Sequence, residues 1–214
     1  MAEVKLHQGQ PIECQGLPLS EAKAAMIMIH GRGAGAGGMI PYIHHFESEG
    51  FAYLIPSAAD LTWYPERFLV PRERNEPKLS SALSLIGELL KEVAEAGIPA
   101  EKTVLLGFSQ GACLALEYAA RHPQKLGGLV AWSGGLIGAD DELTGYTGSL
   151  NGTPVFMGCS DIDFHVPVAR VYQSAEILHG LGAEVDARIY PKMGHVVNLD
   201  EVKAVNTMMK ALVD

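Results

Sequence analysis

The sequence predicts an open α/β sandwich, in which helices cover both faces of a mostly parallel sheet formed as one domain by residues 1–214. Short apolar runs alternate with helical patterns, and most of these runs are too continuously apolar for a sheet with one face in water. No repeat, charge block or linker composition divides the chain. With 48% hydrophobic residues, 214 residues suffice to bury a full core, and the composition excludes disordered and collagen-like classes.

The predicted strands are short apolar segments that end at Gly, Pro or polar residues, as is typical of buried strands. Parallel neighbours need crossover connections, which are right-handed in nearly all proteins. The six predicted strands comprise residues 24–29, 51–55, 103–107, 128–132, 154–158 and 184–190.

Helical patterns separate these strands. Residues 81–96 carry an apolar stripe at helical spacing, and a second helix is predicted directly after Ser109. Residues 167–181 repeat apolar residues at the same spacing, between a proline and a glycine. A last helix begins after Asn198, which can cap it, and Glu201 stands three residues further on as in a capping box.

Two long segments, residues 56–78 and 133–151, show neither pattern. Irregular loops of this length are uncommon in compact domains unless they are functional. In an open α/β sheet, ligands bind outside the carboxyl ends of the strands, where both segments would emerge. We therefore expect these two loops to form the walls of a pocket.

Charge and hydropathy narrow the classes of partner and the location. Sixteen Lys and Arg against 25 Asp and Glu give a net charge of −9, so the chain lacks the positive field that attracts nucleic acids and anionic membranes. Its longest wholly apolar run, residues 24–29, is far shorter than the roughly 20 residues of a membrane span. Residues 1–16 lack a signal-peptide core. We expect a soluble, cytoplasmic protein.

The cysteines and histidines show no pattern of metal ligands. Cys14, Cys113 and Cys159 are widely spaced and form no CxxC pair, so neither disulfides nor structural zinc are expected. The adjacent His44 and His45 would point in different directions in a helix or in a strand. The sequence therefore predicts no metal site.

The segment Gly107-Phe108-Ser109-Gln110-Gly111 contains the pattern G-x-S-x-G between a predicted strand and a predicted helix. A nucleophile elbow has this form because a strained strand-to-helix turn exposes the serine hydroxyl, and the two glycines leave room for the crowded backbone. The helix that follows would direct N–H groups toward a developing negative charge. We therefore interpret Ser109 as a nucleophile, against the alternative of a chance motif in a glycine-rich chain.

A serine nucleophile needs a base and a group that orients the base. His195 follows the last predicted strand at its carboxyl end and is the candidate base, whereas His122 and His179 lie at helix ends and are interpreted as structural. Asp161 and Asp163 both follow the preceding strand. Residue positions alone leave the choice between these two carboxylates open.

Four motifs, in order, resemble those of the phospholipase/carboxylesterase family of α/β-hydrolases, which includes acyl-protein thioesterases. The resemblance covers nearly the whole chain and implies an α/β-hydrolase fold, and the chain is too short for a large cap domain. It also implies that Asp163 rather than Asp161 is the acid, and that the backbone N–H groups of Arg32 and Gln110 form an oxyanion hole. The motifs are His30-Gly31-Arg32-Gly33, Gly107-Phe108-Ser109-Gln110-Gly111, Asp163-Phe164-His165-Val166-Pro167 and Gly194-His195.

Departures from these motifs fall near the expected pocket. Trp63 and Tyr64 resemble an aromatic pair of the family and, together with Phe164, are candidate pocket residues. Phe164 replaces a usual proline, and His165 replaces a usually apolar residue. The Arg32 side chain would face solvent, or alternatively an anionic group of the substrate.

By this resemblance the chain looks like a bacterial carboxylesterase that cleaves esters of small to medium acyl groups through Ser109, Asp163 and His195, without a cofactor or metal. Hydrolysis of thioesters or lysophospholipids is the alternative, since each reaction passes through one tetrahedral oxyanion. The expected partner is a small-molecule ester or thioester substrate. The oligomeric state stays open between a monomer and a homodimer.

Two hypotheses come from other classes of protein. Residues 33–38 contain G-x-G-x-x-G after a predicted strand, as in dinucleotide-binding modules, but the acidic residue expected at the end of the next strand is missing. The other hypothesis is a non-catalytic hydrolase fold used only for binding. The presence of a serine, an acid and a histidine at suitable places argues against it.

Overall fold

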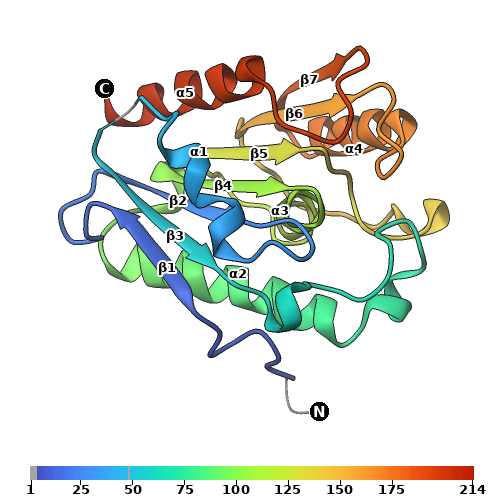
Figure 1. The fold of residues 1–214 in the computed structure, drawn as a ribbon, viewed down its shortest axis with the longest axis horizontal. Coiled ribbons are helices and arrows are strands. Elements are labelled where there is room, and N and C mark those ends of the chain that lie inside the picture. The colour runs from blue at the N-terminus through green and yellow to red at the C-terminus, as the bar shows by residue number, and fades with distance from the viewer. Residues whose placement is uncertain (1–3, 48) are drawn as a thin grey trace.

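Seven strands form one sheet at the centre of the molecule (Figure 1). The computed structural model describes residues 4–47 and 49–214. The strand order is β1-β3-β2-β4-β5-β6-β7, and all neighbours are parallel except the antiparallel edge pair β1 and β3. The strands are β1 (Ile12–Gly16), β2 (Ala24–Ile29), β3 (Phe51–Pro56), β4 (Thr103–Phe108), β5 (Gly128–Trp132), β6 (Pro154–Ser160) and β7 (Glu184–Tyr190).

The six predicted strands are confirmed. β2, β5 and β7 have the predicted ends, and β3, β4 and β6 extend one or two residues further. The sequence did not predict β1, because all five of its residues are exposed and carry no apolar pattern. Its conformation depends on pairing with β3 rather than on burial of its own side chains.

Helices cover both faces of the sheet, as predicted. Successive side chains of a strand point to opposite faces, so Ile27 of β2 packs in one core cluster and Met26 in the other. The first cluster lies under α2, α3 and α4, and the second lies under α1 and α5. The helices are α1 (Ile40–Ile43), α2 (Lys78–Glu95), α3 (Gln110–Arg121), α4 (Val168–Gly180) and α5 (Leu199–Val213).

Four of these helices confirm predictions, with ends displaced by up to three residues, and the single turn α1 was not predicted. None of the helices within residues 4–47 and 49–214 combines the length and the apolar character that crossing a membrane would need.

All three cysteines are free thiols. Burial raises the pKa of Cys113 and of Cys159 to about 12, so both are protonated at neutral pH.

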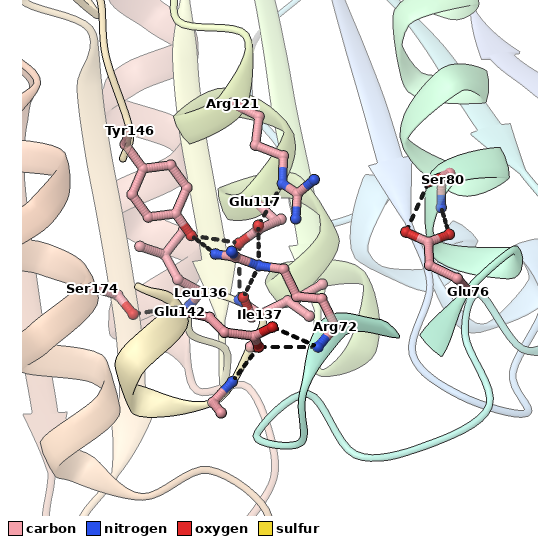
Figure 2. A network of polar contacts seen from close by, with 12 residues as sticks. Arg72, Glu76, Ser80, Glu117, Arg121, Leu136, Ile137, Glu142, Tyr146 and Ser174 are labelled. Carbon is pink, nitrogen blue, oxygen red and sulfur yellow. Dashed lines mark hydrogen bonds and ion pairs between the residues drawn. The ribbon is translucent and has the colours of Figure 1, made fainter. Parts of the chain in front are cut away.

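A buried carboxylate ties both long irregular loops to α3 (Figure 2). Glu117 on α3 is fully buried and accepts hydrogen bonds from Arg121 Nε at 2.6 Å, the Ile137 backbone N–H at 2.9 Å and the Tyr146 hydroxyl at 3.1 Å. Arg72 Nε lies 3.2 Å from the same carboxylate. Arg72 comes from the first loop, whereas Ile137 and Tyr146 come from the second. One buried charge therefore holds both loops in place.

A capping box fixes the start of α5. Asn198 Oδ1 accepts the backbone N–H groups of Asp200 and Glu201, and Glu201 Oε2 accepts the Asn198 N–H at 2.8 Å. The Glu201 side chain is fully buried, and its Oε1 has no hydrogen-bond partner. Burial raises its pKa to about 7, the hydrogen bond from Asn198 opposes this shift, and the Asp200 charge adds to it.

Glu201 should make the free energy of unfolding depend on pH between about 4.5 and 7. In the unfolded chain a glutamate ionises near pH 4.3, whereas burial keeps this carboxyl protonated up to about 7. Its favourable contribution is therefore complete below pH 4.3 and is lost as the pH rises through 7. In Glu201→Gln, the free energy of unfolding should fall less than in the parent over this range, by roughly 2 to 3 kcal/mol.

Urea unfolding at pH 5 and pH 7.5 measures this difference. Glu176→Gln, at an exposed position on α4, is the control and should keep the parent's pH dependence. An unchanged pH dependence in Glu201→Gln would show that this carboxyl is ionised in the folded protein.

Candidate functional site

The serine of the G-x-S-x-G motif occupies a strained turn between β4 and α3. Ser109 has φ 54° and ψ −116°, a conformation that residues with a side chain rarely adopt. The turn is tight because Gly111, in the first turn of α3, lies against the end of β2. A Cβ atom at Gly111 would overlap the carbonyl group of Ile29, and one at Gly107 would overlap the backbone of Gly111. Both glycines are therefore required by close approach.

The structure brings Ser109, His195 and Asp163 together in one hydrogen-bonded series. His195 Nε2 lies 2.8 Å from Ser109 Oγ, and His195 Nδ1 lies 2.6 Å from Asp163 Oδ2. The three residues follow β4, β7 and β6 respectively, so they meet at the carboxyl edge of the sheet. An ionised carboxylate can only accept, so Nδ1 carries the ring proton and Nε2 is free to accept the serine hydroxyl.

Hydrogen bonds hold the Asp163 carboxylate in its ionised form. Burial of the side chain opposes ionisation, but the hydrogen bond from His195 and those from the backbone N–H groups of His165 and Val166 outweigh it, and the pKa is lowered. Asp161 has a different environment: its Oδ1 accepts the Lys192 backbone N–H at 2.7 Å. Of the two candidate acids, the structure thus places Asp163 beside the histidine.

Arg32 and Gln110 line the pocket beside Ser109, and each has a backbone N–H group without a protein acceptor among the described residues. Gln110 is the first residue of α3, where N–H groups lack acceptors within the helix and the helix dipole favours negative charge. Gln110, Arg32 and Ser109 all line one pocket, so the two donors can act on an oxygen atom bound near the serine.

The side chains of Arg32 and Gln110 both form hydrogen bonds with the backbone of residues 63–66. Gln110 accepts the Trp63 backbone N–H at 2.9 Å and donates to the Tyr64 carbonyl at 2.8 Å. The Arg32 guanidinium donates to the carbonyls of residues 64–66 at 2.7 to 2.9 Å. Arg32 is an exposed residue, as expected, and three backbone carbonyls of the neighbouring loop bind its guanidinium.

The pocket has a volume of about 360 Å³ and combines apolar and cationic walls. Tyr64 contributes to it as predicted, but Trp63 does not: its ring is fully buried, and its Nε1 donates to the His30 carbonyl. Phe164 is 77% exposed and lies outside the lining. The lining residues are Gly31, Arg32, Ala34, Tyr64, Glu66, Arg67, Phe68, Phe108, Ser109, Gln110, Cys113, His165, Val166 and His195.

Several pocket residues escaped the sequence analysis because no motif contains them. Phe68 and Arg67 reach the site from the long loop after β3, and Cys113 reaches it from the first turns of α3. The prediction that this loop forms a pocket wall would have found Phe68 and Arg67 as candidates. Arg72 of the same loop lies 3.2 Å from the buried Glu117 carboxylate, a long-range contact that local sequence does not signal.

The glycine-rich segment 33–38 does not open a long helix. It leads into a three-residue 3-10 helix, Ala36–Gly38, and then into the single turn α1. A dinucleotide-binding fingerprint needs a longer helix whose N-terminus faces the pyrophosphate, so the geometry contradicts that alternative. Among residues 4–47 and 49–214, no cluster of three or more His, Cys, Asp or Glu side chains is arranged to hold a metal ion.

Comparison with known proteins gives matches along nearly the whole chain. The family model described as Phospholipase/Carboxylesterase matches residues 12–213. A phospholipase/carboxylesterase structure from Dyadobacter fermentans is 40% identical, with a TM-score of 0.91 over 98% of this chain and 100% of that one.

The curated relatives include proteins named acyl-protein thioesterase 1 from Gibberella zeae and Saccharomyces cerevisiae. The one from Gibberella zeae is 37% identical over 54% of this chain, but the match spans only 52% of that protein. The one from Saccharomyces cerevisiae is 27% identical over 90% of this chain and 94% of that protein. The likeness to the yeast relative therefore extends over at least 90% of both sequences, whereas the likeness to the Gibberella zeae relative covers about half of each.

Proposed function

Because the chain belongs to the phospholipase/carboxylesterase family of α/β-hydrolases, we propose that it is a serine hydrolase that cleaves carboxylic esters through Ser109, His195 and Asp163. The hydrogen-bonded series Ser109–His195–Asp163 carries this proposal, because it provides a nucleophile, a base and a group that orients the base. Thioesters are the second candidate substrates, since the curated relatives named above are acyl-protein thioesterases. The same groups would also serve for lysophospholipids.

In the first half of the reaction, Ser109 Oγ attacks the acyl carbonyl carbon while His195 Nε2 takes the hydroxyl proton. The carbonyl oxygen becomes an oxyanion that the Arg32 and Gln110 N–H groups stabilise. When the tetrahedral intermediate collapses, His195 gives its proton to the leaving alcohol or thiol, and the acyl group stays on Ser109. The Asp163 carboxylate stabilises the imidazolium in between.

In the second half, water replaces the leaving group beside His195. His195 takes a proton from this water as its oxygen attacks the acyl-enzyme, and the same N–H groups stabilise the second oxyanion. Collapse releases the carboxylic acid and returns the proton to Ser109. His195 Nε2, which lies 2.8 Å from Ser109 Oγ, exchanges protons with Ser109, with the leaving group and with the attacking water.

Pocket size supports small to medium acyl groups. A volume of about 360 Å³ lies at the low end of the roughly 300 to 1,000 Å³ typical of ligand pockets. Phe68 and Phe108 provide apolar surface for an acyl chain.

We also propose a cytoplasmic location, which the three free thiols support because reducing compartments keep cysteines unpaired.

Hydrolysis of a p-nitrophenyl ester series from acetate to palmitate tests the proposed function. We expect the rate to be highest for short and medium chains, and Ser109→Ala to lower kcat by about 10⁴-fold or more because the nucleophile is lost. Initial rates at several substrate concentrations give kcat and KM for each chain length. Equal activity of Ser109→Ala and the parent would overturn the proposal, and activity on thioesters alone would select the second candidate.

The two aspartates near His195 should differ in their effect on turnover. Asp163→Asn removes the charge that fixes the His195 tautomer, so kcat should fall by about 10³-fold to 10⁴-fold. Asp161→Asn, in the same loop but bonded to Lys192, is the matched control and should stay within about threefold of the parent. Steady-state rates on one ester decide between them; a larger loss in the Asp161 variant would assign the acid to the other carboxylate.

Loss of the hydrogen bonds from Arg32 and Gln110 to the loop at Tyr64 should change kcat more than KM. Arg32→Met and Gln110→Ala each free this loop from one partner, which loosens the oxyanion donors, and we expect each to lower kcat about 10-fold to 100-fold. Because both side chains bind the Tyr64 carbonyl, the double variant should lose less than the product of the single losses.

Steady-state kinetics on a neutral ester, with thermal unfolding to verify folding, measures this non-additivity. Arg74→Met is the control: Arg74 lies in the same loop region and makes one exposed contact with Glu66 at 3.4 Å, so its loss should change kcat less than twofold. Independent, multiplying effects of the two substitutions would contradict a shared role in holding the loop.

A further inference from the structure

The pocket carries more positive than negative charge, in a chain whose net charge is −9. Arg32 and Arg67 both line it, and within the described residues neither forms an ion pair with a carboxylate. Glu66 is the acidic side chain of the lining, and its carboxylate lies 3.4 Å from Arg74. The Asp163 carboxylate lies behind His195, outside the lining, where three N–H groups bind it.

Of the two arginines that line the pocket, Arg67 has fewer hydrogen-bond partners among the described residues. The Arg32 guanidinium is held by three backbone carbonyls, whereas Arg67 donates one long hydrogen bond, from Nη2 to the His165 carbonyl at 3.3 Å. Within the described part of the chain, its other N–H groups donate to no protein atom. A guanidinium with free donors in a planar fork matches the geometry of a carboxylate or phosphate.

Arg67 is connected through His165 to His195, the residue that protonates the leaving group in the proposed reaction. In the proposed reaction, His195 Nε2 protonates the leaving oxygen or sulfur, so the leaving group must lie beside this ring. The His165 ring packs edge-on against the His195 ring, with 4.8 Å between their centroids, and Arg67 binds the backbone of the same His165. An anionic group a few atoms beyond the scissile bond would therefore meet the Arg67 guanidinium.

We propose that Arg67 forms an anion subsite and that the alcohol or thiol released by this enzyme carries a carboxylate or phosphate group. The proposal rests on the serine-hydrolase function proposed above. It assigns Arg67 a role in specificity rather than in the chemical steps, because it binds the leaving group and touches none of the reacting atoms. It also predicts that the subsite acts before the acyl-enzyme forms and has no effect afterwards.

Two butyrate esters with leaving groups of nearly equal shape test this subsite: 3-carboxyphenyl butyrate and 3-carbamoylphenyl butyrate. The parent should show a higher kcat/KM for the carboxylate ester. In Arg67→Gln this preference should fall by about fivefold to tenfold, since a charge-assisted hydrogen bond is lost, while kcat/KM for the amide ester changes less than twofold. 3-Phosphonophenyl butyrate then shows whether a phosphoryl group binds better than a carboxylate.

Glu66→Gln provides the opposite change of charge. It removes the negative charge of the pocket lining, so the preference for the carboxylate ester should rise. Lys91→Gln, which removes an exposed charge on α2 outside the pocket, should leave the preference unchanged. Raising the salt concentration should weaken the preference in the parent and have little effect in Arg67→Gln.

The outcomes separate this proposal from the proposed function. Hydrolysis of both esters by the parent but not by Ser109→Ala, with no preference for the carboxylate, overturns the subsite and leaves the serine hydrolase intact. Equal losses on both esters in Arg67→Gln would likewise overturn the subsite, because they would mean that Arg67 only supports the loop at His165. Absence of hydrolysis of either ester, or hydrolysis that persists in Ser109→Ala, would count against the proposed function itself.

Hydrolysis of the butyryl-enzyme, which both esters form, should proceed at the same rate for both. A rate that differs between the two esters would contradict a role of Arg67 confined to the leaving group.

Discussion

The packing of the first turn of α3 against the end of β2 is the constraint on which the candidate site depends. Gly111 approaches the Ile29 carbonyl so closely that no Cβ atom fits between them. This contact forces the chain to turn sharply at Ser109, which takes a positive φ and projects its side chain above the sheet edge. The same turn leaves the Gln110 N–H without a helical acceptor. The proposed nucleophile and one of the two proposed oxyanion donors, Gln110, thus come from one rigid corner of the fold.

In the loops that form the pocket walls, side chains rather than neighbouring strands supply hydrogen-bond partners for backbone N–H and C=O groups. A buried loop must find partners for its N–H and C=O groups, since each unpaired group costs free energy. Arg32 and Gln110 bind the carbonyls and the N–H of the loop around Tyr64, and Glu117 binds the second loop through the Ile137 N–H. These long-range contacts give irregular segments a defined shape, so the pocket is preformed.

Charge in this protein is distributed unevenly. The chain is acidic as a whole, yet the pocket beside His195 presents two guanidinium groups, one held by the protein and one with free donors. An excess of one sign of charge in a pocket focuses the electric field and raises the local concentration of ligands of the other sign. The negative charge elsewhere on the chain does not cancel this effect at short range, because salt screens charges more than about 10 Å away.

The sequence by itself determined the order along the chain of six of the seven strands and four of the five α-helices, because local periodicity, glycine spacing and caps signal them. The same kinds of signal located the elbow at Ser109 and the loop that supplies His195. Residue positions alone made Asp161 and Asp163 equally good candidates for the acid, and only the family resemblance favoured Asp163. The tertiary structure places Asp163 beside His195, and this required the register of β6 against β7, which no local pattern encodes.

The tertiary structure also decided the edge strand β1, the burial of Trp63, the exposure of Phe164 and the partners of Arg32. In each case the outcome depends on contacts between residues far apart in the chain. An exposed strand forms only because another strand pairs with it, and the Arg32 guanidinium has a fixed position only because folding gathers three carbonyls around it. Residue types limit which contacts are possible, but the packing of distant segments selects among them.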